Sequence, residues 1–414
     1  MKHITIIGGG IIGLCTAYYL QQDGHQVYVI DKNNISQGAS FVNAGFISRS
    51  HIIPLAAPGI ITKGLKMMFN ANSPFFIKPR LEKEFLQWAW AFKKSATQSK
   101  VDKAIPVYKN FIAYSAQLYN ELKQKELFDF HIEKKGLIVC YKTQKYAAIE
   151  TKIGKRAVLE GLDVDFLTPD DTQKLEPAFS SDILGAVYYK DDLHATPVLF
   201  MKELKKYLKR QGVQLFLNEK VLSLKTKGNT LTHIKTDKQT LSVDEVVFAS
   251  GSWTPHILNK IGIKLLLQAG KGYRIDINPP TTIQIPALLA EAKVAVTPMQ
   301  NFTRFAGTME IDRINHTIFK NRVLAIANLA KNYYRNLHIP EKAINQATCG
   351  LRPVTPDGLP YIGKLSFYKN ITVATGHAMM GWTLAPATGK LVTQIIDDKK
   401  PEIPLELFNP ERRF

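Results

Sequence analysis

The chain begins with a β-branched strand that leads directly into a glycine-rich turn, Ile4–Gly13. Gly8, Gly10 and Gly13 occupy the glycine positions of the pattern G-x-G-x-x-G. The first permits a tight turn, the second lets the backbone approach a pyrophosphate, and the third allows the following helix to pack closely on the strand. The start of that helix presents free N–H groups and a positive dipole end to phosphates. The pattern therefore predicts a β-α-β unit that binds a dinucleotide.

A second strand, Gln26–Asp31, completes this unit and ends in an acid. Asp31 follows Gly13 by 18 positions, close to the spacing expected for the carboxylate that bonds the ribose hydroxyls. A carboxylate there disfavours a 2′-phosphate, which argues against NADP. The motif alone does not separate FAD from NAD, but its place at the very start of the chain favours FAD. Lys32, directly after the acid, is a further cofactor-binding candidate.

The chain length and the number and spacing of its cysteines limit which classes of protein are possible. With 414 residues, the chain exceeds what one core usually supports, so two domains are expected. Cys15, Cys140 and Cys349 are scattered without a C-x-x-C spacing. We therefore expect no disulfide framework, no zinc or other metal site, and a reducing cytoplasmic compartment.

The formal net charge of +19 raises the question of an anionic partner. Because the lysines do not gather into one arm and no nucleic-acid motif accompanies them, we expect no nucleic-acid partner. An anionic membrane surface is a better match, and Ile52–Phe69 has the apolar and lysine content of an interfacial segment, although a buried loop is the alternative. No run approaches the ~18 apolar residues of a spanning helix. The expected location is cytoplasmic, with peripheral contact on the inner face of the membrane.

Patterning along the rest of the chain indicates two interleaved domains. Residues 81–128 favour helices broken near Pro106. Parallel-sheet strands are expected at Val213–Leu217, Glu245–Ala249 and Ile371–Thr375, and residues 264–310 alternate as antiparallel strands do. We assign residues 1–75, 190–262 and 346–414 to a nucleotide-binding domain, and residues 76–189 and 263–345 to a substrate domain.

Several motifs resemble one family throughout the chain. They are Gly38–Gly45, Lys271–Tyr273, Gly350–Gly363 and Thr375–Leu384. Together they resemble the D-amino-acid oxidase superfamily of FAD-dependent oxidoreductases, and within it the bacterial D-amino acid dehydrogenases of the small-subunit type. The resemblance implies an α/β fold, in which a Rossmann-like FAD-binding domain with a parallel sheet is interleaved with an α+β substrate domain built on an antiparallel sheet.

The same resemblance implies a set of cofactor contacts. Residues of the Asn-Ala-Gly segment would line the diphosphate and flavin: Ser40, Asn43, Ala44 and Gly45. Val221 would meet the adenine, and Ala249 and Gly251 would cover the cofactor from the other side. Backbone N–H groups near the flavin pyrimidine ring would come from Gly376, Gly381, Trp382 and Thr383. The Arg-Pro-Val-Thr-Pro stretch lacks the cysteine with which sarcosine oxidases attach their flavin, so non-covalent FAD is expected.

Arg352 is the main substrate candidate. A guanidinium grips a carboxylate bidentately, and Pro353 and Pro356 would stiffen its loop. Its family counterpart holds the substrate α-carboxylate; the alternative is a structural ion pair, for example with Asp357. Tyr273 and His377 are weaker candidates for substrate binding, because a core tyrosine or a packed loop histidine explains them equally well. His194, in Asp191–Ala195, is expected to order a turn at the domain junction.

The resulting hypothesis is FAD-dependent oxidative deamination of D-amino acids to 2-oxo acids and ammonia, by hydride transfer from the α-carbon to flavin N5. Electrons would pass to a quinone or another acceptor. Within the superfamily, a D-hydroxyproline or D-proline dehydrogenase and a glycine oxidase are alternatives. From another class, a non-catalytic FAD-binding subunit of a membrane-associated complex also fits. The substrate side chain, the acceptor and the oligomeric state are left open by the sequence.

Overall fold

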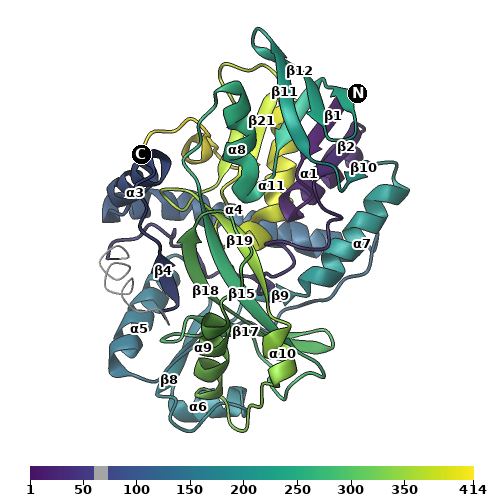
Figure 1. The fold of residues 1–414 in the computed structure, drawn as a ribbon. Helices are drawn as coiled ribbons and strands as arrows, with labels where there is room; N and C mark the ends of the chain where they lie inside the picture. Colours follow the sequence, from purple (N-terminus) through teal and green to yellow (C-terminus); the bar gives the residue numbers. More distant parts are fainter. Residues whose placement is uncertain (60–72) are drawn as a thin grey trace.

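A computed structural model describes residues 1–59 and 73–414. Its upper part in Figure 1 is a six-stranded sheet in the order β10-β2-β1-β14-β21-β20. The strands are β1 (His3–Ile7), β2 (Gln26–Asp31), β10 (Gln214–Leu217), β14 (Glu245–Phe248), β20 (Tyr361–Lys364) and β21 (Ile371–Thr375). All neighbours pair in parallel except β20, which joins β21 antiparallel. Helices α1 (Ile11–Gln22), α7 (Pro197–Arg210) and α11 (Gly381–Ile396) pack together beside this sheet.

The lower part is a nine-stranded sheet in the order β19-β15-β18-β17-β16-β6-β8-β7, with β4 paired to β18. Its strands are β4 (Phe75–Ile77), β6 (Leu137–Tyr141), β7 (Val164–Leu167), β8 (Gly185–Tyr189), β15 (Gln268–Ile277), β16 (Ala287–Leu289), β17 (Val294–Met299), β18 (Phe302–Asp312) and β19 (Thr348–Val354). Most pairs are antiparallel; β16 with β6 and β18 with β4 are parallel. Helices α5 (Gln144–Leu159), α6 (Pro169–Leu175), α9 (Lys320–Lys331) and α10 (Glu341–Asn345) accompany it. The expected fold class is confirmed.

Two small sheets complete the strand inventory of the described residues. One is a meander of β11 (Val221–Lys227), β12 (Thr230–Thr236) and β13 (Thr240–Ser242). The other has the order β3-β9-β5, from β3 (Phe46–Ile47), β9 (Leu193–Ala195) and β5 (Ile132–Glu133). The short helices η1 (Gly251–Trp253), α8 (Thr254–Leu258), η2 (Asn259–Ile261) and η3 (Glu406–Phe408) lie in connections.

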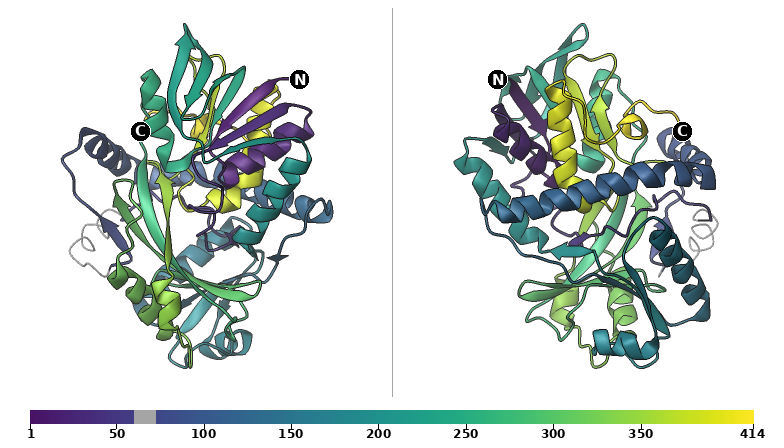
Figure 2. Two further views of the ribbon diagram at one scale, coloured as in Figure 1. Left: turned by 45° about the vertical axis from the view of Figure 1, so that its right-hand side comes forward. Right: turned by 180° about the vertical axis from the view of Figure 1, so that it is seen from behind.

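The expected helix break near Pro106 is wrong. Helix α3 (Lys83–Ser95) ends before Thr97, whose side chain caps α4 (Gln98–Gln124), and α4 then runs unbroken through Pro106. A proline inside a helix removes one hydrogen bond and strains the preceding turn. Burial of a long apolar face against α11 offsets that loss, since Tyr108, Phe111 and Ile112 are almost fully buried. Figure 2 (right), which views the molecule from behind, shows α4 as the long blue helix crossing this back face.

The domain boundaries stay a proposal, and one strand shows why a simple cut is difficult. β19 comes from the C-terminal segment that we assigned to the nucleotide-binding domain, yet it pairs with β15 of the nine-stranded sheet. Among residues 1–59 and 73–414, no helix is long and apolar enough to cross a membrane.

Candidate active site

A cavity of about 1160 Å³ is bounded by the carboxyl ends of the parallel strands on one side and by β15, β18 and β19 on the other. Ligands of open α/β sheets bind at such carboxyl ends. Fifteen predicted site residues line it: Gly8, Gly10, Asp31, Lys32, Ser40, Asn43, Ala44, Val221, Ala249, Gly251, Arg352, His377, Gly381, Trp382 and Thr383. Gly13, Gly45, Gly376 and Tyr273 are not part of the lining.

The three motif glycines are required for different reasons. Gly8 has φ +112°, and a Cβ there would lie 2.5 Å from the carbonyl oxygen of Ala249. A Cβ on Gly13 would lie 1.9 Å from the carbonyl oxygen of Gly8, so helix and strand touch at this point. At Gly10 the nearest atom to an added Cβ is Ser40 Oγ at 3.4 Å, which is ordinary contact. The protein itself leaves the space at Gly10 open, as a site for a pyrophosphate at a helix N-terminus requires.

Asp31 and Ser40 order the backbone around that space. Asp31 Oδ2 accepts a hydrogen bond from the Gly9 N–H (2.7 Å), and Oδ1 accepts one from Asn33 (2.8 Å). Burial raises the pKa of Asp31, and these two hydrogen bonds oppose the rise. Ser40 Oγ accepts from the Ile11 N–H (2.9 Å) at the first turn of α1. A carboxylate has about four acceptor positions, so Asp31 retains capacity for a ligand in the cavity.

Lys32 and Trp253 form a neighbouring wall of the cavity. The Lys32 ammonium lies 3.5 Å from the centroid of the Trp253 ring, and His316 stacks on the same indole with centroids 5.9 Å apart. Burial lowers the pKa of Lys32. The lysine is therefore placed as a cation–π partner of Trp253 at this edge of the cavity.

The segment carrying Asn43 and Ala44 is held by the nine-stranded sheet. Fully buried Arg304 donates through Nη1 to the carbonyl oxygens of Phe41 (3.0 Å) and Asn43 (2.7 Å), and its other nitrogens bond Asp276 at 2.8 and 3.0 Å. Thr297 Oγ1 donates to the Ala44 carbonyl (2.7 Å). Sequence analysis missed Arg304; an arginine inside the alternating stretch 302–312 was the available signal. Arg304, held by its ion pair with the partly exposed Asp276, fixes the loop that the resemblance assigns to the flavin.

Gly45 and Gly376 act behind the cavity wall. A Cβ on Gly45 would lie 2.2 Å from the Ala195 carbonyl oxygen, and one on Gly376 would lie 2.5 Å from Thr355 Cγ2. Both have positive φ, +81° in each case, which favours glycine. Their positions are thus explained by turn geometry and close packing.

Arg352 lies inside strand β19, and not in a proline-stiffened loop as expected. β19 is an edge strand, where a proline such as Pro353 costs no ladder bond on its free side. The guanidinium packs on Gly272 of β15: a Cβ there would lie 2.2 Å from Arg352 Nη1. Asp357, the alternative ion-pair partner, pairs instead with Arg412 at 2.7 and 2.8 Å. Burial lowers the pKa of Arg352 to about 10, so the side chain stays charged at neutral pH.

A strained residue aims a carbonyl at Arg352. Thr308 has φ +69°, a conformation that β-branched residues rarely adopt. It lies where the β15–β18 register shifts between Lys271 and Tyr273, and its carbonyl oxygen accepts from Arg352 Nη1 at 2.7 Å. Bulges of this kind re-aim groups beside binding sites. Sequence analysis missed Thr308, because the bulge depends on cross-strand register and leaves no local pattern.

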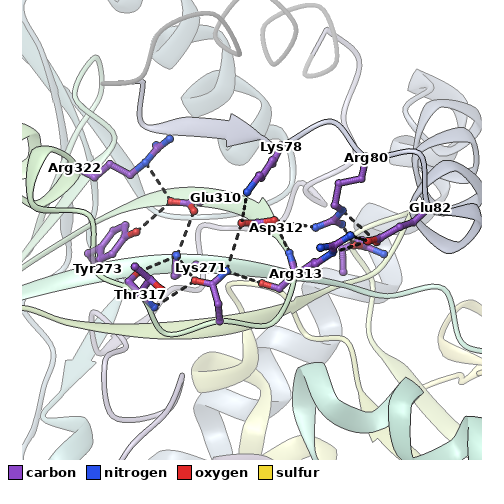
Figure 3. A network of polar contacts seen from close by, with 12 residues as sticks. Lys78, Arg80, Glu82, Lys271, Tyr273, Glu310, Asp312, Arg313, Thr317 and Arg322 are labelled. Carbon is purple, nitrogen blue, oxygen red and sulfur yellow. Dashed lines mark hydrogen bonds and ion pairs between the residues drawn. The ribbon is translucent and has the colours of Figure 1, made fainter.

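Tyr273 does not join Arg352 in the cavity. Neighbouring residues of a strand point to opposite faces, and Tyr273 is 1% exposed on the face away from Gly272. Its hydroxyl donates to Glu310 Oε2 (3.1 Å), in a buried network where Glu310 also pairs with Lys271 (3.2 Å) and Arg322 (3.1 Å), as Figure 3 shows. Burial raises the pKa of Tyr273, and Glu310 reinforces the shift. Tyr273 is therefore a core residue whose hydroxyl is hydrogen-bonded within the protein, which is the alternative to a substrate-binding role.

His377 and the start of α11 close the cavity. His377 Nε2 lies 3.0 Å from Thr388 Oγ1, while Nδ1 finds no hydrogen-bond partner in the described part of the chain. Burial lowers the pKa of His377 to about 3, so the imidazole is neutral at physiological pH. Thr383 Oγ1 donates to the Phe46 carbonyl oxygen (3.0 Å). Gly381, Trp382 and Thr383 form the N-terminal turn of α11, whose free N–H groups and positive dipole end suit an anionic ring.

Comparison with known proteins agrees with this geometry. The family model of the FAD dependent oxidoreductases (DAO) matches residues 3–395. The D-amino acid dehydrogenase of Vibrio vulnificus (strain CMCP6) is 33% identical, covering 98% of each chain. That of Helicobacter pylori (strain ATCC 700392 / 26695) is 30% identical, covering 96% of this chain and 95% of the relative. The crystal structure of glycine oxidase from Geobacillus kaustophilus superposes with a TM-score of 0.79 at 21% identity, covering all of both chains.

These matches span nearly the whole chain, and the residues around the cavity fit the cofactor of the family. Space at Gly10 for a pyrophosphate, an acidic side chain at Asp31 and the helix N-terminus at Gly381 all face one cavity. The chain belongs to the DAO family of FAD-dependent oxidoreductases.

Proposed function

We propose that the protein is a D-amino acid dehydrogenase, which converts D-amino acids to 2-oxo acids and ammonia. One observation carries the proposal: the charged Arg352 guanidinium lies in the cavity wall, and within the described residues its hydrogen-bonding partners are the Thr308 carbonyl oxygen and the Met309 sulfur, without a carboxylate. Arg352 is half-buried, and a cation removed from much of its water without an anionic partner is costly. A substrate α-carboxylate would supply the missing charge. The two dehydrogenases at 30% and 33% identity support the same substrate class.

Arg352 would bind and orient the substrate. A guanidinium has five N–H donors in a planar fork, and the Thr308 carbonyl holds one edge of it. Gly272 leaves the room that this orientation needs. The remaining donors are those that a carboxylate accepts bidentately. The arrangement fixes the carboxylate, and with it the direction in which the α-carbon hydrogen points.

The cavity wall near Arg352 would control the substrate amine. Met309 and Val354 line it, and Trp88 anchors this wall through a hydrogen bond from its indole N–H to the Val354 carbonyl oxygen (2.9 Å). An apolar environment lowers the pKa of an ammonium group, so the amine would lose its proton without a side-chain base. His377, neutral at physiological pH, bears no charge that would repel it. When bound, the flavin supplies the hydride acceptor.

Replacement of Arg352 tests the proposal directly. We expect Arg352→Ala to lower kcat/KM for a D-amino acid by more than ~100-fold, about 3 kcal/mol, while visible flavin absorbance is retained. Arg352→Lys should recover only part, since a lysine lacks the fork geometry. Arg335→Ala, which alters an exposed arginine bonded to Gln173, is the matched control. Near-normal kinetics for the Ala variant would contradict the carboxylate role.

A substrate panel with a dye acceptor separates the alternatives. D-alanine, D-phenylalanine, cis-4-hydroxy-D-proline and glycine would be compared by kcat/KM, with ammonia release measured for each. Dominant turnover of glycine or of the cyclic imino acid would favour a glycine oxidase or a D-hydroxyproline dehydrogenase. A flavin-loaded protein that turns over none of them would support the non-catalytic subunit.

We further propose that electrons leave to a quinone at an anionic membrane surface. The support comes from α3: Leu86 and Trp90 on this helix are 50% and 59% exposed, and Leu81 just before it is 97% exposed. Lys93 and Lys94 lie 5.5 and 6.0 Å from the centroid of the Trp90 ring. Exposed apolar side chains beside lysines suit an anionic lipid interface. In the expected interfacial segment, Ile52 and Ala56 are buried, and residues 60–69 lie outside the described residues.

Vesicle binding tests the membrane proposal. We expect co-sedimentation with phosphatidylglycerol vesicles at low salt, and weaker binding to phosphatidylcholine vesicles or at high salt. The double variant Leu86→Glu, Trp90→Glu should abolish binding with its flavin retained, whereas Leu159→Glu at another exposed leucine should not. Fast peroxide production without gain from a soluble quinone, and no vesicle binding, would make the protein an oxidase.

A further inference from the structure

The small sheet β3-β9-β5 gathers three potential metal ligands. His131 and Glu133 are two residues apart along an extended segment, so they point to the same face. Glu133 pairs with His194 across the β5–β9 ladder, which brings the second histidine alongside. His194 therefore belongs to strand β9 and does not order a turn, as the sequence had suggested, because its backbone pairs with Phe46 on one side and Glu133 on the other.

The distances among these side chains suit a small divalent ion. His131 Nε2 lies 3.5 Å from Glu133 Oε1, and His194 Nε2 lies 3.5 Å from Glu133 Oε2. One ligand atom from each residue falls within 4.8 Å of the other two. With metal–ligand bonds of about 2.1 Å, the ligand atoms of a tetrahedral zinc site are about 3.4 Å apart. Those two contacts use different oxygens of the Glu133 carboxylate, so the ligand atoms would have to move together by up to about 1.4 Å to reach that geometry.

Each histidine has a ring nitrogen that is available to bind a metal ion. His194 is fully buried, and neither of its ring nitrogens has a partner of good hydrogen-bond geometry in the described part of the chain; its polar neighbours are the Glu133 carboxylate, 3.5 Å from Nε2, and the Pro298 backbone. A buried polar group without a partner is destabilising and requires an explanation. His131 Nδ1 lies 3.0 Å from Thr196 Oγ1, an outer contact that orients the ring and leaves Nε2 facing Glu133. Lys135 Nζ, 2.9 Å from Glu133 Oε2, is the cation that now competes for the carboxylate.

We propose that His131, Glu133 and His194 form a binding site for a divalent transition metal, with Zn²⁺ the best match and water as the fourth ligand. Imidazole and carboxylate ligands in a four-coordinate arrangement favour zinc. None of the three residues lines the active-site cavity, so the ion would be structural and would tie β5 to β9. The sequence predicted no metal site because cysteine pairs are absent; this site uses no cysteine.

Zinc titration of the flavin-loaded enzyme after chelator treatment tests the site. Isothermal titration calorimetry with ZnCl₂ should show one tight site per chain, and bound zinc should raise the melting temperature. We expect His194→Ala and His131→Ala to weaken zinc binding by at least about 100-fold, beyond the loss seen for outer contacts. His338→Ala, at an exposed histidine, is the matched control and should bind like the wild type.

Lys135→Ala provides a test that does not depend on damaging the site. Removing the competing ammonium should tighten zinc binding about 2- to 5-fold, the range expected for an exposed ion pair. Flavin absorbance and circular dichroism confirm that each variant is folded. Equal zinc affinity in the wild type, His194→Ala and His131→Ala would overturn the proposal, as would a Lys135→Ala variant that binds zinc more weakly than the wild type.

Discussion

Gly13 in the nucleotide-binding β-α-β unit and Gly272 in the nine-stranded sheet are both too crowded for a side chain, but the crowding has different origins. A Cβ on Gly13 would lie 1.9 Å from a backbone carbonyl oxygen, that of Gly8. A Cβ on Gly272 would lie 2.2 Å from the end of a long side chain, Arg352 Nη1. Backbone contacts cannot yield without moving the helix, whereas a guanidinium can move. Gly13 is therefore required for the packing of α1 on β1, and Gly272 is required for the position of the Arg352 guanidinium.

This contrast extends to the regions around the two glycines. In the β-α-β unit, the contact that excludes a side chain at Gly13 is set within one short stretch of chain, between the end of β1 and the start of α1. Around Arg352, the position of the guanidinium depends on β15, β18 and β19, which are joined only through pairing. The structure of the first region can therefore be predicted from local sequence and tolerates little change, whereas in the second region the guanidinium can shift without unfolding the protein.

The largest effect should come from Gly13→Ala. The methyl group would overlap the Gly8 carbonyl and separate α1 from β1, which we expect to cost at least about 3 kcal/mol of unfolding free energy. The measurement is denaturant unfolding together with flavin content after purification. A variant that is as stable as the wild type would show that this region is less rigid than proposed.

Gly10→Val separates stability from cofactor binding in the same motif. Because Gly10 faces open space, the variant should fold with a nearly unchanged melting temperature yet purify without colour, since the side chain occupies the space of the pyrophosphate. Absorbance spectra and thermal melts of the apo protein check this. Full flavin content in Gly10→Val would mean that the phosphate loop is wrongly assigned.

Gly272→Ala should alter the active site while leaving the fold intact. The methyl group would push the guanidinium away from the Thr308 carbonyl, and a displacement of about 1 Å costs roughly 10- to 100-fold in kcat/KM. We expect a raised KM, retained flavin and a melting temperature close to that of the wild type. A matched change at Thr308, Thr308→Gly, keeps the carbonyl and relieves the strain, and should preserve activity. Loss of folding in Gly272→Ala would contradict the adjustable character of this region.

The last prediction concerns pH and the buried contact between Ser50 and Asp192, and its effect is gradual. Burial raises the pKa of Asp192 to about 7, against the hydrogen bonds from Ser50. The native state thus holds an extra proton between about pH 4 and pH 7, so this group lowers stability as pH rises through that window, by at most about 1.4 kcal/mol per pH unit. Asp192→Asn should show a shallower fall in unfolding free energy from pH 5 to pH 7. Parallel pH profiles for both proteins would contradict the shifted pKa.

Sequence by itself determined the nucleotide-binding unit, because its geometry arises from residues close together in the chain. Gly8, Gly10, Gly13 and Asp31 could be placed from spacing alone, and the strands at 213–217, 245–249 and 371–375 from continuous apolar runs. Most of the other predicted site residues followed from the family resemblance of these motifs, and fifteen of the predicted residues line one cavity.

Only the tertiary structure decided what depends on pairing between distant strands. The bulge at Thr308, the room at Gly272 and the clamp from Arg304 to the loop at Asn43 arise from register, which a single sequence does not display. Strand pairing also places Tyr273 on the sheet face opposite Gly272, and it brings His131, Glu133 and His194 together. Pro106 remained inside a helix because burial of its neighbours outweighed its local preference. Contacts between residues that are far apart in the sequence form only when the chain folds, so local sequence patterns do not predict them.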